Sequence, residues 1–240
     1  MTHIPVADPH ALLALWERAL PLPPAAREAL LAGEPAAHTV GEQRRRLLRA
    51  LRQLGPERLA LRCACPACSE QASVDVDPLA LLQALPPTGE QPDHRLDDGP
   101  WRLRFRLPAP GDLQALADID DVEAFVHALL RRCVLDARQQ GRSATPDTLP
   151  QALCERLSAR MEALDPAASL AFAVRCPTCG HAWAAAFDPG QALWTLLQSH
   201  AEQLLLDVDT LAQRYGWHER EILALTSMRR QAYLQLARAD

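Results

Sequence analysis

An internal repeat constrains the fold of this 240-residue chain more than any other feature of its sequence. The segment LALRCACPACSEQASVDVDPLALLQAL, residues 59–85, aligns without a gap with LAFAVRCPTCGHAWAAAFDPGQALWTLL, residues 170–197, at an offset of 111 residues. The equivalent positions include Cys65 and Cys176, Cys68 and Cys179, Val76 and Phe187, Asp77 and Asp188, Pro78 and Pro189, and Leu82 and Leu193. A repeat of this kind indicates that one small structural unit is built twice.

Each copy has the same order of local signals. An apolar strand enters a CPxC turn, a second strand leaves it, and Asp-Pro then starts a helix. Aspartate is a natural helix N-cap, and proline is tolerated at the first helical position because that N–H has no intrahelical partner. The pattern predicts two CPxC zinc-ribbon hairpins, each followed by a helix.

The two CPxC turns together offer four thiols: Cys65, Cys68, Cys176 and Cys179. A structural zinc site uses four ligands in a tetrahedron, and one CxxC turn supplies only two of them. We therefore expect both turns to meet about a pseudo-two-fold axis and bind one structural Zn²⁺, while the segment between them loops out. Iron is the alternative metal for an all-cysteine site.

The other cysteines and two histidines have weaker claims to a metal. Cys63, His94 and His181 are spare ligand candidates, and we expect His181 to be exposed to solvent. Cys133 and Cys154 stand beside leucine and valine in helical patterns, so we interpret them as small buried hydrophobes. A redox role for CPxC is the competing interpretation, but each turn is followed by a strand-like segment and the βαβ context of thioredoxin-type dithiols is missing.

Three regions follow from the repeat. Residues 1–58 form an N-terminal helical region, residues 59–189 contain the zinc-knuckle repeats with an inserted α+β segment, and residues 190–240 form a C-terminal helical region. In the first region the PLPP of residues 21–24 ends one helix. A second helix, over residues 44–54, carries five arginines that we interpret as a solvated basic face. The predicted fold class is α+β, mainly helical.

The segment between the copies has the pattern of a small α+β unit. WRLRFRL, residues 101–107, alternates apolar residues with arginines, which is typical of a half-buried strand whose arginines are solvated. We expect helices that carry residues 122–135, capped by Asp112 or Asp121, and then a polar loop over residues 139–148.

Helical patterns dominate the rest of the chain. A helix is expected through residues 153–164, and apolar residues from 193 to 215 step by three or four along one continuous stripe. Gly216 ends that helix, and residues 219–224 and 228–238 form a short helical hairpin. This hairpin also has the pattern of a helix-turn-helix with Arg229 and Arg230 as phosphate contacts. We favour ordinary packing of its apolar residues on the domain: Ile222, Leu225, Tyr233 and Leu236.

Composition and missing motifs narrow the function. The chain has no lysine, so arginines supply all 25 cations, and the net charge of -5 argues against a dedicated nucleic-acid binder. The N-terminal sequence has no basic n-region, and no run of about 18 uncharged apolar residues occurs, so we expect a cytoplasmic protein without a membrane span. HExxH, P-loop, GxGxxG, GxSxG and zinc-deaminase patterns are all missing, so we expect no enzymatic activity.

The C-terminal stretch LLLDVDTLAQRYGWHEREILALTSMRRQAYLQL, residues 204–236, resembles the baseplate-hub assembly proteins, or assembly chaperones, of contractile phage tails and phage-tail-like contractile injection systems. The CPxC segments, and the FRLP of residues 105–108 before Asp112, are similar to the zinc-ribbon versions of this family. The residues that carry the C-terminal resemblance are Tyr215, Gly216, Trp217, Glu221, Ile222, Arg229, Arg230, Tyr233 and Leu234.

This resemblance implies a non-enzymatic assembly factor or a small baseplate component. Its implied partners are baseplate, hub or spike proteins of a contractile particle, and it supplies no catalytic residues. The alternative function is a zinc-ribbon regulator that binds nucleic acid, and a third possibility is a thiol oxidoreductase.

Overall fold

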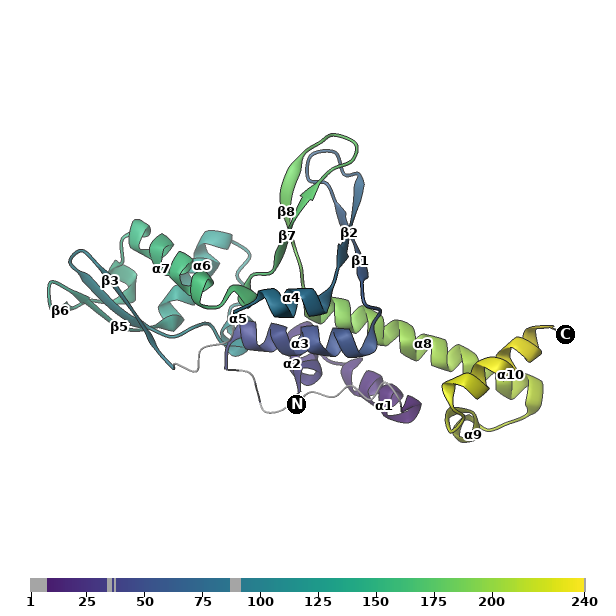
Figure 1. Ribbon diagram of the computed structural model, residues 1–240. Helices are drawn as coiled ribbons and strands as arrows, with labels where there is room; N and C mark the ends of the chain where they lie inside the picture. The colour runs from purple at the N-terminus through teal and green to yellow at the C-terminus, as the bar shows by residue number, and fades with distance from the viewer. Residues whose placement is uncertain (1–7, 34–35, 37, 87–91, 240) are drawn as a thin grey trace.

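The computed structural model describes residues 8–33, 36, 38–86 and 92–239. Helices make up 55% of the structure and strands 18%, which confirms the expected α+β class. Figure 1 shows a central platform of helices, two upright β-hairpins above it, a mixed lobe at one side and a helical C-terminal cap at the other. Within the described residues, no helix has both the length and the apolar character needed to cross a bilayer.

The platform is formed by the N-terminal helices, a short helix and one long helix: α1 (Pro9–Ala19), α2 (Pro24–Ala32), α3 (Val40–Leu54), α4 (Pro78–Ala84) and α8 (Pro189–Tyr215). Its core joins α3 and α8, because Leu47, Leu48 and Leu51 of α3 and Leu193 and Leu197 of α8 are each 0% exposed. Burying one such leucine stabilises the fold by about 2 kcal/mol. The N-terminal helices and the long helix that follows the second repeat copy therefore share one core.

The predicted basic face of α3 is only partly solvated. Arg49 is exposed, but Arg45 is just 6% exposed, and Arg46 pairs with Glu42 one turn earlier. The interpretation of a fully solvated arginine face was therefore wrong. Arg45 is buried where α3 packs against the segment around Asp165, just after α7.

The two repeat segments form antiparallel hairpins that rise from the platform: β1 (Leu59–Ala64) with β2 (Gln71–Val76), and β7 (Ala171–Arg175) with β8 (Ala182–Ala186). Their registers are the same at the repeat offset, since Ala60 pairs with Asp75 and Ala171 with Ala186. Each hairpin is a separate two-stranded sheet. Apolar side chains alternate with exposed ones along every strand, so each hairpin has one apolar face.

The lobe contains a four-stranded antiparallel sheet with helices packed against it. Its elements are β3 (His94–Asp98), β4 (Trp101–Phe105), α5 (Pro110–Ala115), α6 (Val122–Cys133), β5 (Val134–Gln139), β6 (Arg142–Ser143) and α7 (Gln151–Leu164), with the sheet in the order β3-β4-β5-β6. The predicted alternation of β4 is confirmed, because Trp101, Leu103 and Phe105 are buried and the arginines between them are exposed. Most of the rest of the lobe core comes from α6 and α7.

Two sequence expectations for the lobe were wrong. The helix of residues 122–135 ends at Cys133, and residues 139–148, expected as a loop, contain part of a β-hairpin. Gln140 and Gly141 form its turn with φ of 51° and 81°. Positive φ at both turn residues suits the twist of a tight hairpin, and Gln-Gly occupies the place of the more familiar Asn-Gly.

The two candidate capping aspartates have different roles. Asp121 caps α6, because its carboxylate accepts a hydrogen bond from the amide of Ala124 at 2.7 Å. Asp112 lies within α5, is 3% exposed and binds Arg106 at 2.6 and 2.9 Å and Arg132 at 2.9 Å. Asp112 therefore joins α5, α6 and the end of β4 in one charged cluster.

A buried carboxylate connects the lobe to the platform. Asp165, just after α7, is 1% exposed and accepts a hydrogen bond from the amide of Gly41 in α3 at 2.9 Å. A second link is made where the amide of Val40 donates to the carbonyl of Pro108 at 2.9 Å. These contacts hold the lobe against the start of α3.

The C-terminal cap consists of α9 (Glu219–Leu223) and α10 (Ser227–Ala239), which pack on the end of α8 around Leu211, Ile222 and Leu234. Gly216 ends α8 in the left-handed conformation, as predicted. One expectation was wrong, because Leu236 is 59% exposed and does not pack on the domain. The disfavoured helix-turn-helix alternative loses one of its two phosphate contacts, because Arg230 is 5% exposed, with its Nε 3.4 Å from a buried carboxylate of Asp207.

Candidate metal centre

The two CPxC turns lie at the tips of the hairpins and have the same backbone hydrogen bonds. The amide of Cys65 donates to the carbonyl of Glu70 at 2.9 Å, and the amide of Cys176 donates to the carbonyl of His181 at 2.8 Å. These bonds close the ladder directly below each pair of cysteines. The two tips therefore have the same local backbone structure below their cysteines.

A residue with positive φ completes each turn. Gly180 has φ of 72°, and its repeat equivalent Ser69 has φ of 61°. Their amides donate to the carbonyls of Cys176 at 3.1 Å and Cys65 at 2.8 Å. A non-glycine residue in this conformation costs about 1 kcal/mol. The positive φ of Ser69 was not predicted from the sequence, although the alignment of Ser69 with Gly180 was the available signal.

The structure brings all four predicted cysteine sulfurs within 4.8 Å of one another. Cys65 Sγ lies 3.7 Å from Cys179 Sγ, and Cys68 Sγ lies 3.6 Å from Cys176 Sγ. The repeat exchanges these two pairs, so the cluster has approximate two-fold symmetry. Four sulfurs bound tetrahedrally at about 2.3 Å from a metal lie about 3.8 Å apart. The cluster can therefore hold a metal ion with little movement of the backbone.

Burial and hydrogen bonding make the thiols unequal. Cys65 and Cys176 are buried, whereas Cys68 and Cys179 are exposed. The amide of Cys179 points at Cys176 Sγ at 3.5 Å and lowers the pKa of that thiol to about 6. The amide of Glu70 favours the Cys68 thiolate and by itself would lower the pKa of that thiol. Contacts of the Cys68 thiol with the other three sulfurs outweigh this effect and raise its pKa to about 12. Without a cation the sulfurs share protons, and a metal ion would displace those protons.

Helix caps anchor the hairpins below the cluster. Asp77 accepts hydrogen bonds from the second and third amides after it at 2.9 and 3.1 Å, and Asp188 does the same at 2.8 and 3.1 Å. Such a cap stabilises a helix by about 1 kcal/mol. Each hairpin is therefore tied to the start of a helix, α4 or α8, as well as to the other hairpin at its tip.

The spare ligand candidates do not join the cluster. Cys63 lies lower on β1, where its thiol faces a carbonyl of β2 at 3.7 Å. His181 is exposed, as expected, with its ring 6.2 Å from that of Trp183. His94 is in the lobe, with its ring 5.6 Å from that of Phe105. In the part of the chain that the structure describes, the four CPxC cysteines are the only group of three or more such ligands that could hold a metal ion.

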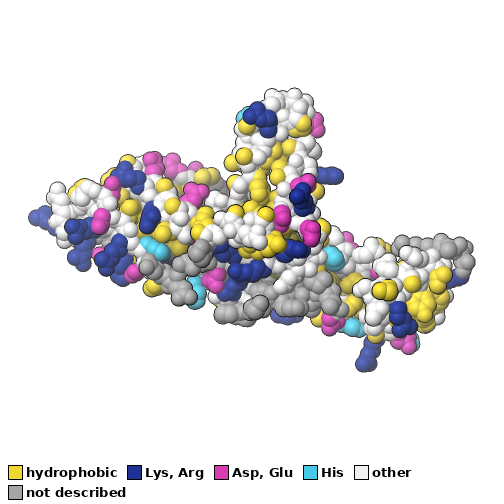
Figure 2. All heavy atoms as spheres, in the orientation of Figure 1, with side chains coloured by type: hydrophobic (Ala, Val, Ile, Leu, Met, Phe, Trp, Pro, Cys, Tyr) yellow, Lys and Arg dark blue, Asp and Glu magenta, His cyan; other side chains and the backbone are white. Residues whose placement is uncertain are grey.

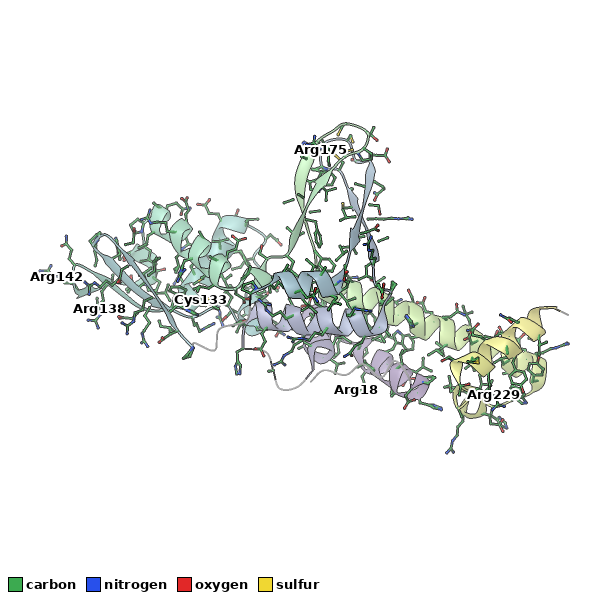
Figure 3. The ribbon with its side chains drawn as sticks, in the orientation of Figure 1. Arg18, Cys133, Arg138, Arg142, Arg175 and Arg229 are labelled. Carbon is green, nitrogen blue, oxygen red and sulfur yellow. The ribbon has the colours of Figure 1, made fainter. Side chains whose placement is uncertain are left out.

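Two further cysteines are part of the lobe core. Cys133 and Cys154 are both buried, and Figure 3 shows Cys133 inside the lobe. Burial raises the pKa of both thiols, that of Cys133 to about 11. Their interpretation as small buried hydrophobes is confirmed.

A positive charge stands beside the cluster. Arg175 precedes Cys176 at the hairpin tip (Figure 3) and donates to the carbonyl of Gly180 at 3.3 Å. Four thiolates around a divalent ion carry a net negative charge, so this arginine has a favourable sign.

Comparison of the chain with protein-family models, with curated proteins and with solved structures finds no match.

Proposed function

We propose that this chain is a non-enzymatic assembly factor, or a small baseplate component, of a contractile phage tail or contractile injection system. It acts in the cytoplasm through contacts with baseplate, hub or spike proteins. Its binding surfaces are held in place by two zinc-ribbon hairpins that share one structural Zn²⁺.

The observation that carries the proposal is the family resemblance of residues 204–236. The aromatic residues that contribute to it lie together in the C-terminal cap. The ring of Tyr215 is 4.8 Å from that of Trp217, and the ring of Tyr233 is 5.7 Å from the first and 4.8 Å from the second. This packing supports a structural reason for the shared pattern and leaves the exposed side of α10 for partners.

The cysteine cluster supports a structural role for the metal. Four thiolates around a tetrahedral ion leave no open position for water or substrate, so the ion stabilises the scaffold and does no chemistry. Among metals that suit thiolates, zinc is the one that structural CxxC pairs typically bind, and iron is the alternative. Metal analysis of the purified chain distinguishes the two, with one zinc per chain as the expected result.

A deletion in the organism that encodes the chain tests the proposed function. We expect contractile particles to be missing, or to lack baseplates in electron micrographs, and a plasmid copy to restore them. Mild affinity purification should recover hub, spike or baseplate proteins in amounts that mass spectrometry can quantify. Normal particles in the deletion strain would refute the proposal.

The alternative, a regulator that binds nucleic acid, is favoured by one surface. Arginines gather on the outer face of the lobe sheet (Figure 2), and Arg138 and Arg142 project from it (Figure 3). However, the acidic partners Asp93 and Asp136 pair with arginines of this face at 3.0 and 3.1 Å. Affinity for DNA that falls steeply with salt would support the regulator in place of the assembly factor.

A further inference from the structure

An apolar cleft of about 410 Å³ lies between the two hairpins, below the cysteine cluster and above α8. Figure 2 shows hydrophobic side chains along the upright hairpins, on the sides that face each other. The largest side chains that line the cleft are Leu59, Leu61, Val74, Phe172, Phe187 and Leu196. The cysteine cluster lies where the tips of the two hairpins meet, and the platform connects their bases. The spacing between the hairpins, and so the width of the cleft, is therefore set at both the tips and the bases.

The walls of the cleft are strand edges. Residues 59–63 of β1 line one side of the cleft and residues 185–187, at the end of β8 and just after it, line the other, while β2 and β7 contribute one residue each, Val74 and Phe172. Because the two hairpins approach each other through β2 and β7, their free edges are those of β1 and β8. In an antiparallel pair, every second residue turns its N–H and C=O away from its partner strand. The bond between the Cys65 amide and the Glu70 carbonyl sets this alternation. The backbone groups of Ala60 and Arg62 therefore point outward from β1.

No backbone hydrogen bond from another element within the described residues engages this edge. Exposed strand edges are usually protected by charges or prolines, because they otherwise pair with other chains. The edge of β8 has no such protection, since its sequence AWAAA contains neither, and β1 has a single arginine. A small apolar molecule would fill the cleft but leave these backbone groups unpaired, whereas an extended peptide would satisfy both features.

We propose that the cleft binds an extended, apolar segment of a partner protein as an added strand on the free edge of β1. Main-chain hydrogen bonds to Ala60 and Arg62 supply affinity, and alternate side chains of the peptide enter the cleft and supply specificity. β1 is the acceptor strand because five consecutive residues of it line the cleft. The inference rests on the proposed function only in that the ligand is a protein, and it specifies how that protein is recognised.

A library of random 12-residue peptides displayed on phage tests this inference against the full, zinc-loaded chain. We expect selected peptides to share alternating apolar residues and few charges. A synthetic copy of a selected peptide, labelled with fluorescein, should bind the chain in an anisotropy titration. Methylating alternate amide nitrogens of that peptide removes main-chain donors while keeping every side chain. This change should weaken binding by about tenfold or more.

The repeat offers a matched pair of protein variants. Ala60→Pro removes an outward N–H from β1, at a position where an edge strand tolerates proline. Ala171→Pro makes the same change at the equivalent position of β7, whose edge does not line the cleft. We expect about tenfold weaker binding for Ala60→Pro and unchanged binding for Ala171→Pro. Circular dichroism and zinc content show whether both variants are folded.

Three results would overturn the inference: no peptide enriched above the bare support, full affinity of the N-methylated peptide, or equal affinity in both proline variants. The affinity of the N-methylated peptide is measured with the unmodified protein, so that result holds even where a proline variant fails to fold. None of these results affects the deletion phenotype that tests the assembly role. Normal particles in the deletion strain, conversely, would refute the assembly role and leave peptide binding intact.

Discussion

A single methyl group placed at Gly41 should destabilise the protein through the joint between lobe and platform. Gly41 is the second residue of α3, and its amide donates to Asp165 Oδ2 at 2.9 Å. A Cβ atom at this position would lie 1.7 Å from Asp165 Oδ1 and 2.3 Å from its Cγ. Two non-bonded atoms cannot lie this close together, so Gly41→Ala must displace the carboxylate of Asp165.

The displacement has two costs and one gain. Asp165 is 1% exposed, and a hydrogen bond to a buried charged group contributes about 2 kcal/mol. The carboxylate also acts on the buried guanidinium of Arg45, whose pKa burial lowers and Asp165 raises. Losing that neighbour adds about 1 kcal/mol, and the better helix propensity of alanine returns at most about 1 kcal/mol. We expect a net loss of about 2 kcal/mol in the free energy of unfolding.

Urea denaturation followed by circular dichroism measures this loss, and the chain contains a matched control. Gly111 is likewise the second residue of its helix, α5, and an added Cβ there would meet no atom within 4 Å. Gly111→Ala should therefore change the stability by less than about 0.5 kcal/mol. Both substitutions add one methyl group at the same helical position, so their difference isolates the clash with Asp165.

A double-mutant cycle decides whether the clash is the cause. Asp165→Ala alone should destabilise the protein, because it leaves the Gly41 amide and the Arg45 guanidinium buried without the carboxylate. Adding Gly41→Ala to Asp165→Ala should then cost less than about 0.5 kcal/mol, since no carboxylate is left to displace. An equal cost of Gly41→Ala in both backgrounds, or equal stability of Gly41→Ala and Gly111→Ala, would refute this reasoning.

Three other perturbations address the remaining parts of the molecule. Burial alone would raise the pKa of Asp112, but hydrogen bonds from its arginine partners lower this pKa to about 2. The ionised carboxylate therefore stabilises the folded protein above pH of about 4, and this contribution is lost as the pH falls towards 2. Asp112→Asn should remove about 2 kcal/mol at neutral pH and flatten the acid limb of a stability profile; an unchanged acid limb would contradict it. Cys65→Ser should lower the zinc content and the temperature of thermal unfolding, because the energy of metal binding at a structural site is folding energy. Full metal content with unchanged unfolding would exclude this role. Arg230→Met should destabilise the cap by about 3 kcal/mol, because it leaves the buried Asp207 carboxylate without a positive charge beside it, and Asp207→Leu in the same chain should restore most of that loss. Urea denaturation followed by circular dichroism reports both variants, and no rescue would mean that the ion pair is not the cause.

Local signals account for the parts of the fold that were predicted correctly. The order of strand, turn, strand and helix in each repeat copy depends on residues close in sequence, such as Asp77 and Asp188 as N-caps. The strand predicted at residues 101–107, which the structure ends at Phe105, and the end of α8 at Gly216 were also visible in period and turn chemistry. Each of these features is set by a few neighbouring residues, so the sequence pattern carries it.

The expectations that failed depend on residues far apart in the chain. β5 follows α6 without a break, because Val134–Gln139 pairs with residues of β4 that lie 29 to 38 positions earlier, and a helical pattern gives no sign of that pairing. The disfavoured helix-turn-helix alternative treated Arg230 as an exposed charge, yet Arg230 is buried and faces Asp207 on α8. In the same way, Arg45 is buried by the segment around Asp165. Burial of a long charged side chain is decided by such distant partners.

The four-cysteine cluster depends on distant residues as well, and it was nevertheless predicted. Cys68 and Cys176 are separated by 108 residues, but the cost of closing a loop rises by only about 0.6 kcal/mol for each doubling of its length. The inserted lobe also has its own hydrophobic core, and burial of that core offsets much of the entropy lost when the residues between the two cysteine turns are ordered. Two turns with the same hydrogen bonds need only approach about a two-fold axis to bring four sulfurs within 4.8 Å of one another. The distant contact was predictable because the repeat supplies both halves of it in the same geometry.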